Sequence, residues 1–161
     1  MSNNYNFYKS SQFNKGLSLS NEFDFIWFAP KFYRLKLHKG SIIKYFFWYL
    51  FTLGGYKILY INDRQKNDFV HWSHVISKTW QFPFMSKNDK QIISCYTKPS
   101  VRGKGLYPFA IQQIAKKYSD LWILSNIKNQ SSNIGITKTG FKLVGIGYKT
   151  IFKRYFIDAK S

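Results

Sequence analysis

The stretch from Gln91 to Phe141 constrains the fold most, because it alternates a strand, a glycine-rich turn, a helix and a second strand. It opens with a short apolar run, Ile92 to Tyr96, between Lys90 and Pro99. A short apolar run bounded by turn residues is typical of a buried strand. We therefore expect a central strand that ends at a turn.

The turn that follows, Ser100 to Pro108, is basic and contains Gly103 and Gly105. Glycine lets a backbone turn approach a ligand closely, and Pro108 suits the first turn of a helix, where its missing N–H is no loss. The amino end of a helix presents free N–H groups and a positive dipole end. This turn is therefore predicted to attract a phosphate.

The residues after the turn predict a helix and then another strand. Apolar residues gather on one side of the helix and polar residues on the other, and Leu121 to Leu124 then forms an apolar run. Such a strand–helix–strand unit has the length that a parallel strand pair needs. In the polar stretch after it, Asn129, Ser131 or Ser132 could cap a short helix that ends at Gly140.

The rest of the chain predicts antiparallel strands and one more helix. In chain order these are one or two strands in Phe23 to Leu37, a helix in Ser41 to Leu53 that Ser41 caps and Gly54-Gly55 ends, and a hairpin of Tyr56 to Ile61 with Phe69 to Ile76. Residues 1–20, rich in Ser and Asn, are expected to be a loosely ordered tail, and residues 21–161 a single domain.

The helix predicted from Ser41 to Leu53 is apolar on every side. It is too short to span a bilayer, which takes about 20 residues. A helix buried in the core is the favoured interpretation. The alternative is contact with a membrane surface, helped by Lys36, Lys39 and Lys44.

Charge and cysteine content narrow the class of protein. The 161 residues include 25 Lys plus Arg against 7 Asp plus Glu, and the net charge of +18 attracts polyanions such as nucleic acid, anionic lipid, coenzyme A or a nucleotide sugar. The alternative is a solvated basic surface without a specific partner. At 45% hydrophobic residues the chain is not disordered, and its single cysteine excludes an internal disulfide and fits a reducing cytoplasm.

Two histidines lie in the second strand of the hairpin, in the run His71-Trp72-Ser73-His74. Alternation along a strand places His71 with Ser73 on one face and Trp72 with His74 on the other. An imidazole with a pKa of about 6.5 can take a proton from an amine at neutral pH, so His71 and then His74 are candidate general bases. The alternative is that one histidine packs in the core and the other is solvated. No Cys or carboxylate lies nearby at ligand spacing, so no metal site is expected.

Other catalytic signatures are weak. A covalent mechanism through Cys95 would need a base aimed at its thiol, and a small buried side chain on the central strand is the favoured interpretation. The chain has neither a Gly-x-Ser-x-Gly elbow nor a Walker A run, because Leu106 follows Gly103-Lys104-Gly105 where the latter needs a hydroxyl.

The spacing of residues in this central stretch resembles that of the GCN5-related N-acetyltransferases, the GNAT superfamily. The family's phosphate-binding motif is Arg or Gln, two residues, Gly, one residue, then Gly or Ala, and here Arg102, Gly105 and Tyr107 occupy those places. A second motif agrees, because Asn129-x-x-Ser132 precedes Gly140-Phe141 at the spacing that the family shows.

This resemblance, which covers roughly Tyr60 to Tyr148, implies a fold, a donor and a site. The implied fold is α/β (α+β): a mixed, mostly antiparallel central sheet with one parallel strand pair and flanking helices. The implied donor is acetyl-CoA, bound by Cys95, Thr97, Arg102, Gly103, Lys104, Gly105, Leu106, Tyr107, Asn129 and Ser132. The strand edge from Ser94 to Thr97 would pair with the pantetheine arm, and a backbone N–H there, that of Tyr96, would polarise the thioester carbonyl.

Two departures from the family pattern matter. Tyr107 stands where Gly or Ala is usual, so the turn is expected to open outward there. Ile136 stands where many members carry the Tyr that protonates the leaving thiolate, so Tyr148, Tyr96 or solvent must take that role, or the thiolate leaves unprotonated. The stretch from His71 to Thr97 is also similar to a GNAT branch found among polysaccharide biosynthesis proteins.

The resemblance therefore implies an acetyl-CoA-dependent N-acetyltransferase, which we expect to be cytoplasmic and a monomer or homodimer. It would move an acetyl group directly to an amine acceptor such as an amino-sugar nucleotide or a related glycan precursor. Two alternatives stay open: a basic, non-catalytic binding protein for nucleic acid or an anionic surface, and an acyltransferase with a longer acyl or an aminoacyl donor. A specific nucleic-acid partner is not expected.

Overall fold

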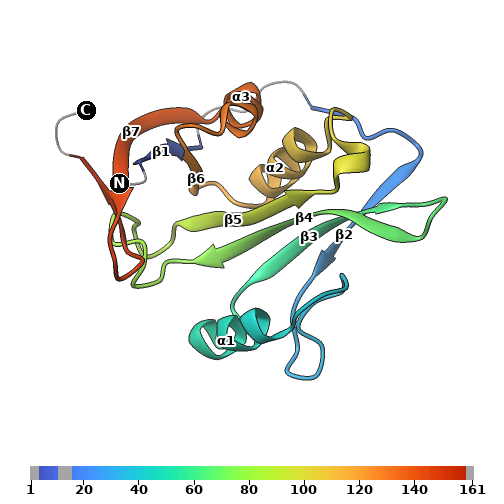
Figure 1. The fold of residues 1–161 in the computed structure, drawn as a ribbon, viewed down its shortest axis with the longest axis horizontal. Helices are drawn as coiled ribbons and strands as arrows, with labels where there is room; N and C mark the ends of the chain where they lie inside the picture. Colours follow the sequence, from blue (N-terminus) through green and yellow to red (C-terminus); the bar gives the residue numbers. More distant parts are fainter. Residues whose placement is uncertain (1–3, 11–15, 159–161) are drawn as a thin grey trace.

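A single mixed sheet organises the chain in the computed structural model, which describes residues 4–10 and 16–158 (Figure 1). Among these residues the sheet has eight strands in the order β2-β3-β4-β5-β6-β1-β7-β8. The elements, in chain order, are β1 (Asn4–Lys9), β2 (Phe23–Phe28), α1 (Ile43–Thr52), β3 (Lys57–Asp63), β4 (Asp68–Ser77), β5 (Lys90–Thr97), the 3-10 turn η1 (Pro99–Val101), α2 (Leu106–Lys117), β6 (Leu121–Asn126), α3 (Gln130–Lys138), β7 (Lys142–Lys149) and β8 (Tyr155–Ile157).

The described strand pairs are antiparallel except for β5 and β6, which run parallel. Helices α2 and α3 cover one face of the sheet, and α1 lies on the other (Figure 1). A hydrophobic cluster fills each face because side chains alternate along a strand: Leu59 packs on the α2 side, and Ile58 and Tyr60 pack on the α1 side. The predicted α+β fold with one parallel pair is confirmed.

Strands β5 and β6 diverge soon after they pair. Their register runs only from Lys90 opposite Leu121 to Ile92 opposite Ile123, although β5 continues to Thr97. On its other edge β5 bulges against β4, and Ser94 in the bulge has a left-handed φ of 48°. The far half of β5 therefore has an edge that β6 leaves uncovered.

Asn4–Lys9 is an inner strand of the sheet, so the predicted loose tail is wrong for these residues. Strand β1 pairs with β6 on one side and β7 on the other, and its Phe7 and Tyr8 are buried. The Ser- and Asn-rich composition of this segment did not indicate a strand. Its aromatic side chains pack on both faces of the sheet. Residues 1–3 and 11–15 of the predicted tail lie outside the described residues.

Helix α1 also differs from the prediction. Ile42 precedes it and no side chain caps it in the described structure, so Ser41 is not the cap, whereas Leu53 and Gly54 end it with left-handed backbones as Gly54-Gly55 predicted. The helix is not buried: Tyr45 is its one buried residue. Within the described residues, no helix is long and apolar enough to cross a membrane.

Candidate active site

The glycine turn after β5 forms the amino end of α2. Gly103 and Gly105 have φ values of 84° and 75°, and Gly105 directly precedes the helix, which has no side-chain cap among the described residues. A Cβ added at either glycine would meet no atom within 4 Å. The turn therefore has open space beside its backbone at the uncapped amino end of a helix, an arrangement that suits a phosphate.

A cavity of about 570 Å³ lies against this turn. It is bounded by the end of β5, the turn itself and the amino end of α3. Its lining includes most residues that the sequence assigned to the coenzyme: Cys95, Thr97, Arg102, Gly103, Gly105, Leu106, Tyr107, Asn129 and Ser132, together with Tyr96. Lys104 is not among them, because its Nζ pairs with the Glu22 carboxylate at 3.0 Å on the surface.

The charged side chains that line this cavity are Arg102 and Lys138. Arg102 Nε donates a hydrogen bond to the Thr97 carbonyl oxygen at 3.2 Å, which holds the guanidinium at the mouth of the turn. Asn129 caps α3, since its Oδ1 accepts from the Ser132 backbone N–H at 3.2 Å. The cavity thus has basic walls and two helix amino ends, all of which favour an anion.

A second cavity of about 220 Å³ opens where β5 and β6 diverge. Ile93 and Ser94 line it from β5, and Ser125 lines it from β6 with a buried hydroxyl that has no hydrogen-bond partner among the described residues. The two cavities share the lining residues Cys95, Tyr107, Asn129 and Ser132. The two cavities therefore adjoin each other, and together they extend from the glycine turn to the divergence of the strands.

Tyr107 turns its side chain toward the two cavities and lines both of them. Its phenol is hydrogen-bonded to the Ser132 side chain, and its ring lies against Gly135. Burial raises the pKa of Tyr107 above its usual value of 10.0, so the phenol keeps its proton at neutral pH.

Cys95 lies beneath Tyr107 on the α2 side of β5. Burial raises the pKa of its thiol to about 11, so the thiol is protonated at neutral pH. A protonated thiol is a poor nucleophile, and this favours the packing role over the covalent one.

His71 is fully buried on the α2 side of the sheet, 0% exposed. Its Nδ1 lies 2.7 Å from Thr97 Oγ1 and its Nε2 lies 2.8 Å from Ser73 Oγ, which agrees with the predicted pairing of His71 and Ser73 on one face. Burial lowers the pKa of His71 to about 3. The His71 side chain therefore links β4 to the end of β5 through hydrogen bonds. Because it is enclosed and stays neutral, this geometry does not support the predicted role of His71 as a general base.

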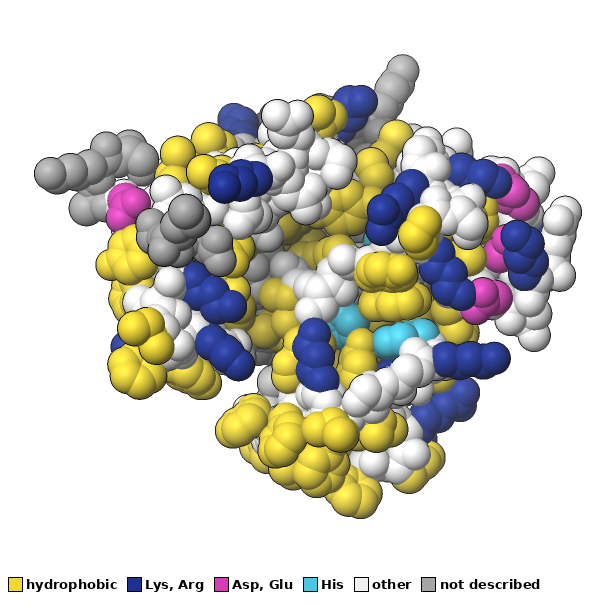
Figure 2. Space-filling view, viewed as in Figure 1, with side chains coloured by type: hydrophobic (Ala, Val, Ile, Leu, Met, Phe, Trp, Pro, Cys, Tyr) yellow, Lys and Arg dark blue, Asp and Glu magenta, His cyan; other side chains and the backbone are white. Residues whose placement is uncertain are grey.

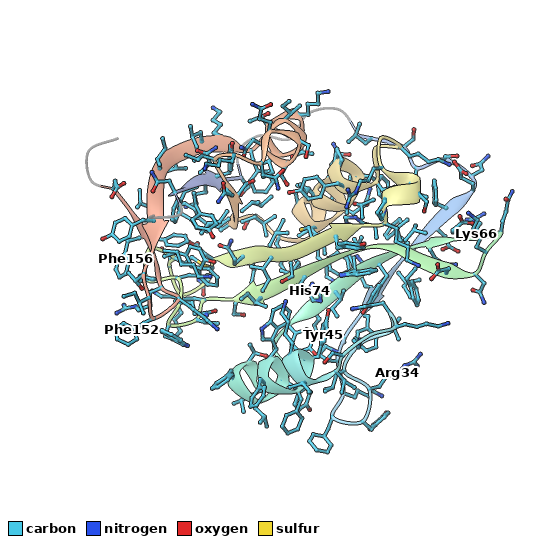
Figure 3. The ribbon with its side chains drawn as sticks, in the orientation of Figure 1. Arg34, Tyr45, Lys66, His74, Phe152 and Phe156 are labelled. Atoms are coloured by element: carbon cyan, nitrogen blue, oxygen red, sulfur yellow. The ribbon has the colours of Figure 1, made fainter. Side chains whose placement is uncertain are left out.

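His74 lies on the opposite face, between the sheet and α1 (Figure 3). The rings of Tyr45 and Trp48 enclose it, with centroids 5.5 Å and 5.1 Å away, and its Nδ1 lies 3.3 Å from the Ser94 carbonyl oxygen. Its Nε2 is buried and has no partner among the described residues. Burial lowers the pKa of His74 to about 3. Both histidines are therefore packed, and neither lines either of the two cavities described above.

An aromatic group that the sequence did not predict covers the α1 side of the β5 bulge. His38 stacks on Trp72 with ring centroids 4.2 Å apart, and Trp72 stacks on Tyr96 at 4.8 Å. Lys44 Nζ donates to Ser94 Oγ at 3.2 Å. Burial, with the charges of Lys36 and Lys44, lowers the pKa of His38 to about 4. Figure 2 shows histidine side chains at the floor of a hollow on this side of the molecule.

Tyr148 is not brought to the cleft. It stacks on Phe156 of β8 at 6.0 Å and is 40% exposed. Strands β6 and β1 separate β7 from β5, so a side chain on β7 is too far across the sheet to serve the end of β5. Tyr148 lines neither cavity, so this geometry does not support the prediction that it protonates the leaving thiolate.

In the described part of the chain, no three His, Cys, Asp or Glu side chains lie close enough together to hold a metal ion.

Solved structures resemble this arrangement in fold. A GNAT-family acetyltransferase from Colwellia psychrerythraea superposes with a TM-score of 0.61 at 10% identity, over 88% of this chain and 53% of that one. A Drosophila protein gives 0.61 at 12% identity, over 91% and 49%. A tandem GNAT protein from the clavulanic acid biosynthesis pathway gives 0.58 at 8% identity, over 88% and 50%.

The chain therefore has the GNAT fold, and at these identities the likeness defines the fold alone. It spans about half the length of each of these proteins. No protein-family model matches the sequence, and no curated protein matches it.

Proposed function

We propose that this protein is an acetyl-CoA-dependent N-acetyltransferase that moves the acetyl group directly to an amine acceptor. One observation carries the proposal. Two adjoining cavities extend from the uncapped amino end of α2 to the divergence of β5 and β6, within a GNAT fold. This shape suits a long donor with a phosphate at one end and a reactive group at the other.

The glycine turn would hold the donor's pyrophosphate. Backbone N–H groups near Gly103 and Gly105, with the cations of Arg102 and Lys138, supply the donors and the charge. The pantetheine arm would lie along β5 from Ser94 to Thr97, because β6 pairs with this strand only as far as Ile92. An extended ligand can add to such an uncovered strand edge through backbone hydrogen bonds.

Coenzyme A supplies an activated thioester, so the acceptor amine can attack without an enzyme nucleophile. A backbone N–H of β5 near Tyr96 would polarise the carbonyl as an oxyanion donor does. Tyr107 lines both cavities and its phenol stays protonated, so we assign it the delivery of a proton to the departing thiolate. Ile136, fully buried in the core, cannot take that role.

The acceptor would bind on the α1 side, beside the Ser94 bulge. The stacked rings of His38, Trp72 and Tyr96 offer faces for a sugar or a base, and Lys36 and Lys44 offer charge for phosphate. These features support an amino-sugar nucleotide as the acceptor class. The positive charges of Lys36 and Lys44 would also lower the pKa of the acceptor amine. The amine would therefore react in its neutral form without a dedicated protein base.

Calorimetric titration with acetyl-CoA and with duplex DNA, at low and moderate salt, tests the proposal. We expect saturable binding of acetyl-CoA that persists at moderate salt, and DNA binding that weakens steeply as salt rises. Mass spectrometry of amino-sugar nucleotides after incubation with acetyl-CoA then tests transfer, with the corresponding free amino sugars as matched controls. DNA binding at moderate salt without any binding of acetyl-CoA would instead establish the non-catalytic alternative.

A further inference from the structure

Helix α1 carries an aromatic face that the described structure leaves uncovered. We define this aromatic face as the exposed apolar residues of α1, with Phe32 before the helix and Leu53 after it: Phe32, Ile43, Phe46, Phe47, Leu50, Phe51 and Leu53. Phe51 is 77% exposed and Leu53 is 91% exposed. Figure 2 shows these hydrophobic side chains gathered over α1 at the lower edge of the molecule.

The face follows from the spacing of apolar residues along the helix. Tyr45, Trp48 and Tyr49 recur at helical spacing and pack on the sheet. A second set, Ile43, Phe46, Phe47, Leu50 and Phe51, recurs at the same spacing on the opposite side and points away from the sheet. One apolar side of α1 packs in the core. The exposure of the second apolar side therefore requires a separate explanation.

The face is continuous rather than scattered. Phe32 lies 6.5 Å from Phe46, Phe46 lies 5.9 Å from Phe47, and Phe47 lies 6.4 Å from Phe51, all between ring centroids. Single exposed apolar side chains are ordinary on a protein surface, but a contiguous patch of rings marks a site of interaction.

The positive charge around the aromatic face indicates which kind of partner it can bind. Residues 31–57 contain no Asp or Glu, and their basic residues are Lys31, Arg34, Lys36, Lys39, Lys44 and Lys57. A second copy of the chain would bring the same basic segment and another net charge of +18 against this one, which opposes self-association through this face. An anionic surface is complementary to it.

We propose that the aromatic face of α1 docks on an anionic membrane surface. The exposed rings and leucines would enter the boundary between headgroups and acyl chains, and the flanking Lys and Arg side chains would contact anionic headgroups. The ten residues of α1 lie on the surface in this arrangement rather than cross it. Because Lys44 and Tyr45 also belong to α1, docking would place the acceptor side of the cleft beside the membrane.

Co-sedimentation with vesicles tests this surface. Vesicles of phosphatidylcholine alone are compared with vesicles of phosphatidylcholine and phosphatidylglycerol, at low and moderate salt. The wild-type protein should bind the anionic vesicles more tightly. Phe47→Ser with Phe51→Ser should lower its partition coefficient at least about tenfold, because two large side chains lose their transfer to the apolar phase. Circular dichroism of both proteins checks that the fold is retained.

Two further variants keep the test decisive. Leu53→Asn removes an apolar side chain at a left-handed position that Asn tolerates, so it lowers membrane binding, by roughly threefold, without straining the helix end. Ile151→Ser with Phe152→Ser is the matched control, since these residues are 96% and 77% exposed in the turn between β7 and β8 (Figure 3), and it should leave binding unchanged.

The proposal is overturned if the wild-type protein fails to bind anionic vesicles, or if the control pair loses as much binding as the α1 pair. Sedimentation velocity tests the alternative that a second copy of the chain covers this face. A dimer that Phe47→Ser with Phe51→Ser dissociates, without any vesicle binding by the wild type, would assign the face to a second copy of the chain instead.

Discussion

Gly135 of α3 lies directly against the ring of Tyr107 of α2, and a Cβ at Gly135 would stand 3.0 Å from Tyr107 Cδ1. Glycine inside a helix costs about 1 kcal/mol relative to alanine, so its presence needs a local reason. Here the missing side chain leaves room for the ring to turn into the cleft. The phenol then reaches Ser132, and these two residues line both cavities.

Tyr107→Phe tests the phenol as the proton donor. We expect kcat to fall by about tenfold, less than general acids usually supply, because a thiolate is already a fair leaving group. The KM for acetyl-CoA should change little, since the ring remains in place. Because burial raises the pKa of Tyr107, the wild-type enzyme should show no decline in kcat from this group at any pH below its usual value of 10.0.

Tyr8→Phe is the matched control for this variant. Tyr8 is also a buried phenol beside α3, and its hydroxyl donates to Asn133 Oδ1 at 3.3 Å, but it lines neither cavity. Its loss should affect thermal stability and leave kcat unchanged. Equal kcat in Tyr107→Phe and the wild type would remove Tyr107 from the chemistry.

Gly105→Asp and Gly105→Asn form a pair that tests the phosphate site. Asp and Asn have nearly the same size, and both tolerate the left-handed backbone found here, with φ at 75°. The new side chain enters open space beside the turn. The Asp carboxylate should repel the pyrophosphate and weaken coenzyme A binding about tenfold more than Asn does.

Calorimetry with coenzyme A measures this difference, and pantetheine, which lacks the pyrophosphate, serves as the control ligand. The two variants should bind pantetheine equally. Equal affinities of the two variants for coenzyme A would show that the pyrophosphate lies elsewhere in the cleft.

The local parts of this site could be predicted from the sequence, because they depend on neighbouring residues. Apolar runs and alternation predicted the hairpin of β3 and β4, and the two glycines with Pro108 predicted the turn and the start of α2. The cap at Asn129 follows the same logic, since it needs only a side-chain oxygen at the start of a helix.

The parts that depend on distant residues could not be predicted. Strand β1 is stabilised by pairing with β6 and β7 from the other end of the chain, and six residues rich in Asn and Tyr carry no sign of such partners. His38 reaches Trp72 only because α1 and its flank fold under the sheet. The pattern of α1 likewise predicted an apolar helix without indicating that one of its sides would stay uncovered.

The buried histidines predict a protein that loses stability in mild acid. The folded protein keeps His71 and His74 neutral, with pKa values of about 3, whereas in the unfolded chain each titrates near 6.5. Above pH 6.5 neither state gains a proton at these residues, so their full contribution to stability is present there. As pH falls from 6.5 toward 3, His71 and His74 bind protons in the unfolded chain but not in the folded protein. The free energy of unfolding therefore decreases.

Each of these two histidines should lower the free energy of unfolding by roughly 1 kcal/mol for every pH unit in that window. Urea denaturation at successive pH values between neutral and mildly acidic measures the slope. His74→Phe should make the slope shallower, because an apolar ring replaces one titrating group within the enclosure of Tyr45 and Trp48. Trp48→Phe alters the same cluster without removing a titrating group, so it should shift the whole curve and keep the slope. A slope unchanged by His74→Phe would mean that His74 accepts a proton in the folded protein, and it would then return as a candidate base.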